Sequence, residues 1–118
     1  MSEVNIATVR RFWDSIASKD VDGYLATFTE DAIAYDPADR PPLRTSDERR
    51  QFMEGLLSTF SEIEPSLDFV TPCGTSTAAK WTVRGRTTSG DPVHLEGIDV
   101  YDHAPDGRLR EMRGYFQM

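Results

Sequence analysis

The chain contains very few of the residues that build disulfides and metal centres. Its 118 residues include one cysteine and two histidines. Cys73 cannot form a disulfide within the chain, a usage typical of the reducing cytosol, so we expect a cytoplasmic protein. His94 and His103 show no metal-ligand spacing with Cys73, so we expect no metal site. The sequence also lacks a serine elbow and a glycine-rich phosphate loop, which leaves nucleophilic and nucleotide chemistry without support.

Basic residues are outnumbered, with 13 Lys and Arg against 20 Asp and Glu and a net charge of -7. An acidic surface repels phosphate backbones and anionic lipids, so we expect neither nucleic acid nor membrane as a partner. No apolar run approaches the roughly 20 residues that span a bilayer, and residues 1–11 lack the apolar segment of a secretory signal. The length predicts one domain over residues 1–118, with a core that needs no disulfide.

Hydrophobic periodicity predicts three helices in the first half of the chain. The first covers residues 3–18. Asp20 is expected to cap a short second helix, and Thr45 and Glu48 form a capping box that begins the third. The apolar stripes of these helices contain Val9, Phe12, Trp13, Ile16 and Ala17, then Tyr24, Leu25 and Phe28, then Phe52, Met53, Leu56, Leu57 and Phe60.

The second half of the chain is predicted to be mostly strands. A first strand covers about residues 32–35, and after Pro65 the pattern changes to period two, with further strands near 79–86, 92–103 and 108–117. Helices first and strands later are typical of an α+β domain. We expect a curved antiparallel sheet with the helices packed on one face and an apolar pocket on the concave side.

Two aspartates interrupt the apolar faces of these strands. Asp36 ends the first strand, and Asp99 lies within Gly97-Ile98-Asp99-Val100. Alternation places Asp99 on the inner face with Tyr101, although a bulge at Gly97 would reverse that register. Each aspartate also has a simpler interpretation: Asp36 as the start of an Asp-Pro turn, and Asp99 as a bulge or edge residue turned to solvent. A buried aspartate is costly unless it is paired, hydrogen-bonded or neutral, so two of them suggest acid–base chemistry.

The order and spacing of several segments resemble the ketosteroid isomerase branch of the nuclear transport factor 2-like (SnoaL-like) superfamily. These segments are Glu30-Asp31-Ala32, Tyr35-Asp36-Pro37, the helix that begins at Thr45, Gly97-Ile98-Asp99-Val100 and the final stretch from Asp106 to Phe116. The superfamily also includes polyketide cyclases and limonene epoxide hydrolase. The resemblance covers nearly the whole chain and implies a cone-shaped α+β fold around a deep apolar pocket.

The resemblance also implies roles for particular residues. Asp36 matches the general base of the isomerases, and Asp99 matches the acid that stays neutral and donates a hydrogen bond to the substrate oxygen. The position of the oxyanion tyrosine on the first helix holds Phe12, which cannot donate, and losing one such donor typically lowers the rate about 10²- to 10³-fold. The implied pocket residues are Phe12, Phe28, Met53, Trp81, Met112 and Phe116.

These observations leave three functions open. The first is cofactor-free isomerisation of a steroid- or polyketide-like carbonyl compound, with Asp36 as the base and neutral Asp99 as the oxyanion donor. The second is non-catalytic binding of a small apolar molecule. The third is another reaction of the superfamily, polyketide cyclisation or epoxide hydrolysis, although the arginine that the latter requires cannot be placed. A homodimer through an outer sheet face that bears Ile98, Val100, Leu109 and Tyr115 is also expected.

Overall fold

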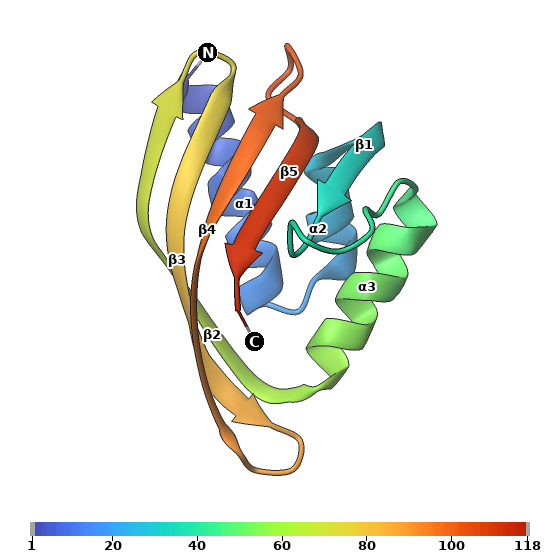
Figure 1. Cartoon of the computed structure of the whole chain (residues 1–118), viewed down its shortest axis with the longest axis vertical. Helices are drawn as coiled ribbons and strands as arrows, with labels where there is room; N and C mark the ends of the chain where they lie inside the picture. The colour runs from blue at the N-terminus through green and yellow to red at the C-terminus, as the bar shows by residue number, and fades with distance from the viewer. Residues whose placement is uncertain (1, 118) are drawn as a thin grey trace.

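The computed structural model describes residues 2–117 and contains three helices and five strands (Figure 1). Two helices come first, and one strand separates them from the third helix, after which the chain is all strand. Within residues 2–117, no helix is both long and apolar enough to cross a membrane. The elements are α1 (Ser2–Ala17), α2 (Val21–Ala26), β1 (Phe28–Tyr35), α3 (Ser46–Ser58), β2 (Phe60–Cys73), β3 (Ser76–Thr87), β4 (Pro92–His103) and β5 (Leu109–Phe116).

The strands form one curved sheet in the order β1-β5-β4-β3-β2. Neighbouring strands are antiparallel except β1 and β5, which are parallel. The helices cover the concave face of the sheet, and the long strands β3 and β4 extend beyond them (Figure 1). The α+β prediction is therefore confirmed, with the parallel β1–β5 pair as an addition to the antiparallel sheet that was expected.

Strand β2 was not among the strands that the sequence pattern predicted. We expected Phe60 to extend the third helix, but α3 ends at Ser58 and Phe60 is the first residue of β2. Thr59 forms the helix C-cap, and its N–H group bonds back to the carbonyls of Leu56 and Leu57. Pro65 lies within β2, where it is tolerated because β2 is an edge strand with one side free of a ladder.

The register irregularity in β4 lies at its end and not at Gly97. Pairing with β3 is continuous through Gly97, the ladder with β5 begins at Gly97, and the shift against β5 falls between Asp102 and His103. This shift turns Leu109 inward, where it is fully buried. The prediction that Leu109 lies on the outer face is therefore wrong, whereas Ile98, Val100 and Tyr115 are exposed there.

A buried arginine ties α3 to β1. Arg49 is 1% exposed, and its guanidinium group donates to the backbone carbonyls of Ala32, Thr29 and Glu30 at 2.7, 3.3 and 3.4 Å. The same group lies over the Phe28 ring at 5.0 Å from its centroid. Three carbonyls and an aromatic face together compensate part of the loss of water around the charge, so Arg49 fixes the helix against the strand that ends at Asp36.

The capping box at the start of α3 provides a direct test of this local structure. The Thr45 hydroxyl accepts a hydrogen bond from the Glu48 N–H group at 3.1 Å, and the Glu48 carboxylate accepts one from the Thr45 N–H group at 3.1 Å. We expect Thr45→Ala to lower the free energy of unfolding by about 1 kcal/mol. Thr45→Ser keeps the hydroxyl and should stay close to wild type in urea denaturation. Equal loss in both variants would contradict the capping role.

Candidate active site

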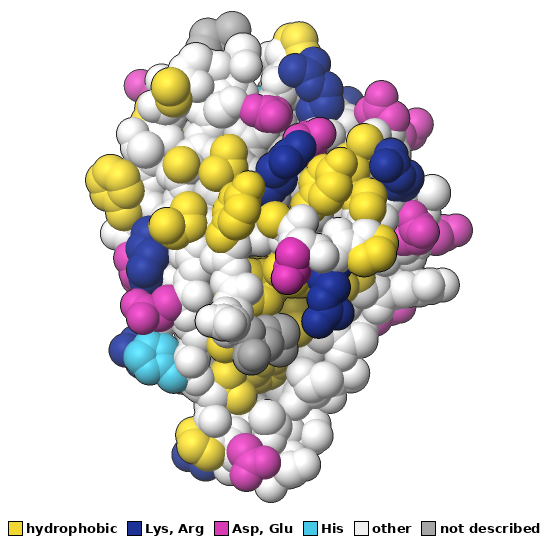
Figure 2. Space-filling model, viewed as in Figure 1, with side chains coloured by type: hydrophobic (Ala, Val, Ile, Leu, Met, Phe, Trp, Pro, Cys, Tyr) yellow, Lys and Arg dark blue, Asp and Glu magenta, His cyan; other side chains and the backbone are white. Residues whose placement is uncertain are grey.

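A cavity of about 720 Å³ lies between the helices and the concave face of the sheet. Its size falls in the range of pockets that hold small molecules. Exposed residues among its lining, Asp39, Arg40, Pro41 and Gln117, mark the mouth, and Figure 2 shows a hollow with hydrophobic side chains in its interior. Apolar side chains from α1, α3 and the sheet form most of the wall, among them Ile16, Phe52, Leu56, Phe60, Ile63, Val83 and Leu95.

The cavity brings together most of the residues that the sequence singled out. Both predicted acids line it, together with four of the six predicted pocket residues: Phe12, Met53, Trp81 and Phe116. The two others, Phe28 and Met112, are buried in the core and do not belong to the lining. Phe28 packs against the rings of Phe12 and Tyr24 at 6.1 and 5.2 Å, and so supports the wall from behind.

The two carboxyl groups converge over one glycine of β5. Gly114 pairs with Asp99 in the antiparallel ladder, and the parallel ladder pairs Tyr35 with Arg113, so Asp36 comes next to Gly114 as well. A methyl group at Gly114 would lie 2.9 Å from Asp36 Oδ1 and 3.1 Å from Asp99 Oδ1. A side chain at this position would therefore displace Asp36 and crowd Asp99, and both carboxyl oxygens lie next to the space that glycine leaves open.

Asp99 is held by two hydrogen-bond donors inside the protein. The Trp81 indole Nε1–H donates to Asp99 Oδ1 at 3.0 Å, and the Tyr101 hydroxyl donates to Oδ2 at 2.6 Å. The Trp13 indole donates to the Tyr101 oxygen at 3.1 Å. An indole N–H can only donate, so the Tyr101 oxygen accepts from Trp13 and its own hydrogen is directed to Asp99.

A second glycine makes room for this arrangement. Gly97 of β4 lies opposite Trp81 in the ladder, and an added methyl group would collide with the Trp81 indole ring. The ring therefore lies directly against the backbone of β4, two residues before Asp99. Glycine at position 97 permits the close approach that directs the indole N–H group towards the carboxylate.

The environments of the two acids push their pKa values to different levels. Burial raises the pKa of Asp99 to about 6, an effect that the Tyr101 and Trp81 hydrogen bonds oppose. Burial, followed by the negative charge of Asp99, raises the pKa of Asp36 to about 8. Within residues 2–117 no hydrogen-bond donor reaches the Asp36 carboxyl group, whose exposed part faces the cavity. Between pH 6 and pH 8 the pair therefore holds one proton, predominantly on Asp36.

Sequence reasoning missed the residues that support the two acids. Tyr101 lies two positions after Asp99 on the same strand face, so alternation did place it inward but gave no sign of its bond to Asp99. Trp13 was part of the apolar stripe of the first helix and was interpreted as core. Gly114 alternates with Met112 and Phe116, and only the pairing of β1 with β5 explains why this position must be small.

No group of three potential metal-ligating side chains comes together within residues 2–117. The polar groups that line the cavity are chiefly the three carboxyl groups of Asp36, Asp39 and Asp99, the guanidinium group of Arg40 and the hydroxyl groups of Thr59 and Thr87. These groups can donate protons to a molecule in the otherwise apolar cavity and accept protons from it.

The fold and site define a small α+β pocket protein, and the comparisons identify its family. Residues 9–112 match the model of the SnoaL-like domain, so the chain belongs to that family. No curated protein sequence matches it. The sequence-based assignment to the SnoaL-like, nuclear transport factor 2-like superfamily is thus confirmed at this level.

Solved structures share the fold over nearly the whole chain. SalBIII, an epoxide hydrolase/cyclase-like enzyme in pyran ring formation in polyether salinomycin, has a TM-score of 0.89 at 19% identity, with 99% of this chain and 93% of that chain covered. Rv0760c from Mycobacterium tuberculosis, in complex with estradiol-17beta-hemisuccinate, has a TM-score of 0.86 at 15% identity, with 98% and 95% covered. An NTF2-like protein of unknown function from Exiguobacterium sp. 255-15 has a TM-score of 0.81 at 17% identity, with 93% and 98% covered. At these identities the similarity shows the fold.

The raised pKa of Asp36 predicts how stability depends on pH. Because the folded chain binds the Asp36 proton more tightly than the unfolded chain, the free energy of unfolding should fall as pH rises from about 4 to about 8. Asp36→Asn removes the Asp36 contribution and leaves the smaller fall between about pH 4 and pH 6 that comes from the raised pKa of Asp99, and we expect it to be more stable than wild type at pH 9 by on the order of 2–4 kcal/mol. Urea denaturation between pH 5 and pH 9 measures the effect. Asp14→Asn, which changes an exposed residue of α1, is the matched control, and an equal response in both variants would contradict the burial argument.

Proposed function

We propose that the chain is a cofactor-free acid–base catalyst of the ketosteroid isomerase type, acting on a steroid- or polyketide-like carbonyl compound. The observation that carries this proposal is the convergence of two carboxyl groups with unlike hydrogen-bonding over Gly114 at the wall of an apolar cavity. Pairs of acids whose environments separate their pKa values can supply one base and one hydrogen-bond donor at the same pH.

The surroundings of the acids favour an exchange of the roles that the resemblance implied. Asp99 accepts two hydrogen bonds, which stabilise its ionised form, whereas Asp36 has the higher pKa and faces the cavity. In this assignment Asp99 takes the proton from the carbon next to the carbonyl group, and the electrons of that C–H bond move into the enolate. Protonated Asp36 donates a hydrogen bond to the enolate oxygen, and Asp99 returns the proton to the conjugated carbon.

The donors available to the enolate oxygen are fewer than in the isomerases that the sequence resembles. Phe12 has no hydroxyl group, and the Tyr101 hydrogen is directed to Asp99. The enolate oxygen is then left with Asp36 as its donor, and the loss of a second donor lowers the expected rate by about 10²- to 10³-fold.

Non-catalytic binding of a small apolar molecule is the second candidate, and Phe12 is the observation that favours it. The structures of Rv0760c with a steroid derivative and of SalBIII, named for pyran ring formation, make steroids and cyclic polyethers the first ligands to test. Epoxide hydrolysis has less support. Within residues 2–117, Arg40 is the one arginine that lines the cavity, and it is exposed at the mouth.

Turnover of an unconjugated 3-ketosteroid, followed by the absorbance of the conjugated enone, tests the two candidates. We expect slow turnover by wild type and a loss of at least about 100-fold in kcat/KM in both Asp36→Asn and Asp99→Asn. Asp14→Asn should match wild type, because residue 14 is exposed on α1 away from the cavity lining. Steroid binding without turnover would support the binding candidate, and turnover that survives both substitutions would remove the acids from the mechanism.

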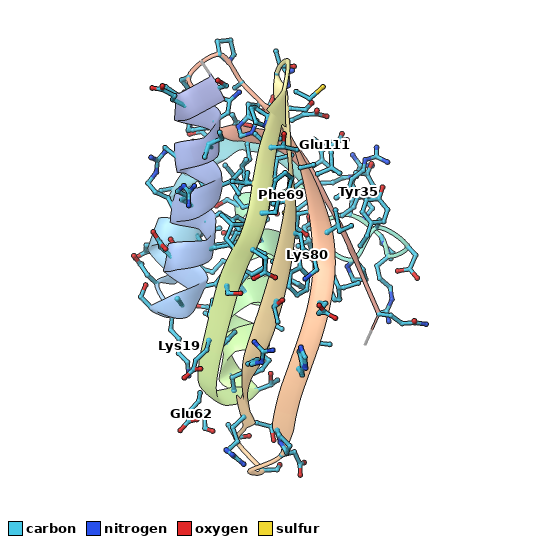
Figure 3. All side chains as sticks on the ribbon, turned by 90° about the vertical axis from the view of Figure 1, so that its left-hand side faces the viewer. Lys19, Tyr35, Glu62, Phe69, Lys80 and Glu111 are labelled. Atoms are coloured by element: carbon cyan, nitrogen blue, oxygen red, sulfur yellow. The ribbon has the colours of Figure 1, made fainter. Side chains whose placement is uncertain are left out.

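We further propose that the outer sheet face mediates a homodimer. An outer patch, defined by Phe69, Ile98, Val100 and Tyr115, has side-chain exposures of 64%, 50%, 36% and 50%. The ladders place Ile98 opposite Tyr115, and Lys80 lies between Phe69 and Ile98. Figure 3 shows this side of the sheet, with Lys80 and Tyr35, opposite to α1. A cluster of exposed apolar side chains bordered by charges is typical of an interface between protein chains.

A negative charge introduced into the patch tests the dimer. We expect wild type to sediment as a dimer and Ile98→Asp to sediment as a monomer with unchanged circular dichroism, because a carboxylate at the centre of an apolar contact would be buried without a partner. Val4→Asp changes a residue of similar exposure on α1 and should leave the dimer intact. Analytical ultracentrifugation that finds wild type monomeric would exclude the proposal.

A further inference from the structure

Both tryptophans of the chain donate their indole N–H groups into the same buried network around Asp99. Trp81 reaches Asp99 directly at 3.0 Å, and Trp13 reaches the Tyr101 hydroxyl group at 3.1 Å. The four side chains come from three elements: Trp13 from α1, Trp81 from β3, and Asp99 and Tyr101 from β4. All four are at most 7% exposed. Neither indole can accept a hydrogen bond, so every hydrogen bond in this buried network is donated towards the Asp99 carboxylate.

The direction of these hydrogen bonds distinguishes the two protonation states of Asp99. When Asp99 is ionised, each carboxylate oxygen accepts one hydrogen bond and Tyr101 both accepts and donates. If Asp99 carried its proton on Oδ2, the Tyr101 hydroxyl group would have to turn its hydrogen elsewhere. Within residues 2–117, Asp99 is the one acceptor to which the Tyr101 hydroxyl group donates. The network therefore fits the ionised form, whereas a proton on Oδ2 would leave it with an unpaired donor.

We propose that Tyr101, oriented by the indole of Trp13, is a positioning residue that keeps Asp99 ionised and directed at the cavity. Tyr101 does not line the cavity, so it acts through Asp99 and not on a ligand. The hydroxyl group restricts Oδ2, the Trp81 indole restricts Oδ1, and the carboxylate plane is thereby fixed from both sides. The use of this carboxylate as a base rests on the proposed function, whereas the hydrogen-bond network does not.

Three titratable groups interact electrostatically with Asp99: Asp36, Tyr101 and Tyr24. Asp36 faces it across Gly114 from the end of β1, and its raised pKa separates its titration from that of Asp99. Tyr101 on β4 and Tyr24 on α2 have their pKa values raised by burial and stay neutral in the physiological range. Among these groups, only Asp36 titrates in a neighbouring pH range.

The presence of just two tryptophans makes the network directly observable. A ¹H–¹⁵N spectrum should contain two indole resonances, and Trp13→Phe assigns them by removing one. In wild type the Trp81 resonance should shift with a midpoint near pH 6 as Asp99 ionises. Tyr101→Phe should raise this midpoint by about 1–2 pH units, since a hydrogen bond to a charged group stabilises it by about 1.5–3 kcal/mol. Asp36→Asn should leave the midpoint in place.

Two controls make the result decisive. Tyr115→Phe removes an exposed hydroxyl group on β5 and should leave the Trp81 midpoint unchanged. Trp13→Phe keeps the Tyr101 hydroxyl group and should raise the midpoint less than Tyr101→Phe does, and it provides the test if Tyr101→Phe does not fold. An unchanged midpoint in the folded Tyr101 variant, or in Trp13→Phe where that variant is the test, would overturn the inference. The measurement requires no turnover, so an inactive protein with the expected midpoints would count against the proposed function alone.

Discussion

The site depends on the two hydrogen bonds that Asp99 accepts inside the sheet. Burial alone would favour the neutral acid, and the Trp81 and Tyr101 donors partly offset that effect. Neither donor could reach Asp99 without particular neighbours. Gly97 lets the Trp81 ring lie against β4, and Trp13 orients the Tyr101 hydroxyl group. The position of one carboxylate therefore depends on the first helix, α1, and on two consecutive strands, β3 and β4, in the other half of the chain.

Asp36, in the same cavity, lacks the hydrogen-bond donors that Asp99 has among the described residues. It follows β1, which α3 holds in place through the buried guanidinium group of Arg49, but its own carboxyl group accepts no hydrogen bond from residues 2–117. Its proton is retained because the nearby charge of Asp99 and the apolar walls disfavour a second anion. One acid is thus stabilised as an anion by the protein, and the other is left for a ligand to satisfy.

Much of the fold follows from local sequence signals, whereas the site depends on long-range pairing. The capping box at Thr45 and the alternation around Asp99 were sufficient to predict the start of α3 and the inward face of β4. Alternation could not show the bulge between Asp102 and His103, which buries Leu109. The meeting of Asp36 and Asp99 over Gly114 results from the parallel pairing of β1 with β5, and such pairing between distant segments leaves no local pattern.

The burial of two neighbouring carboxyl groups reduces the stability of the folded chain, and a bound ligand would change this balance. An apolar ligand that displaces water from the cavity lowers the local polarity, which strengthens the repulsion between two carboxylates on either side of Gly114. Loading the cavity therefore favours the state with a single proton. A ligand oxygen next to Asp36 would accept that proton in a hydrogen bond, which the folded chain does not otherwise provide. The pair of acids is thus a cost to the folded protein, and under the proposed function a carbonyl oxygen on an apolar molecule would relieve it.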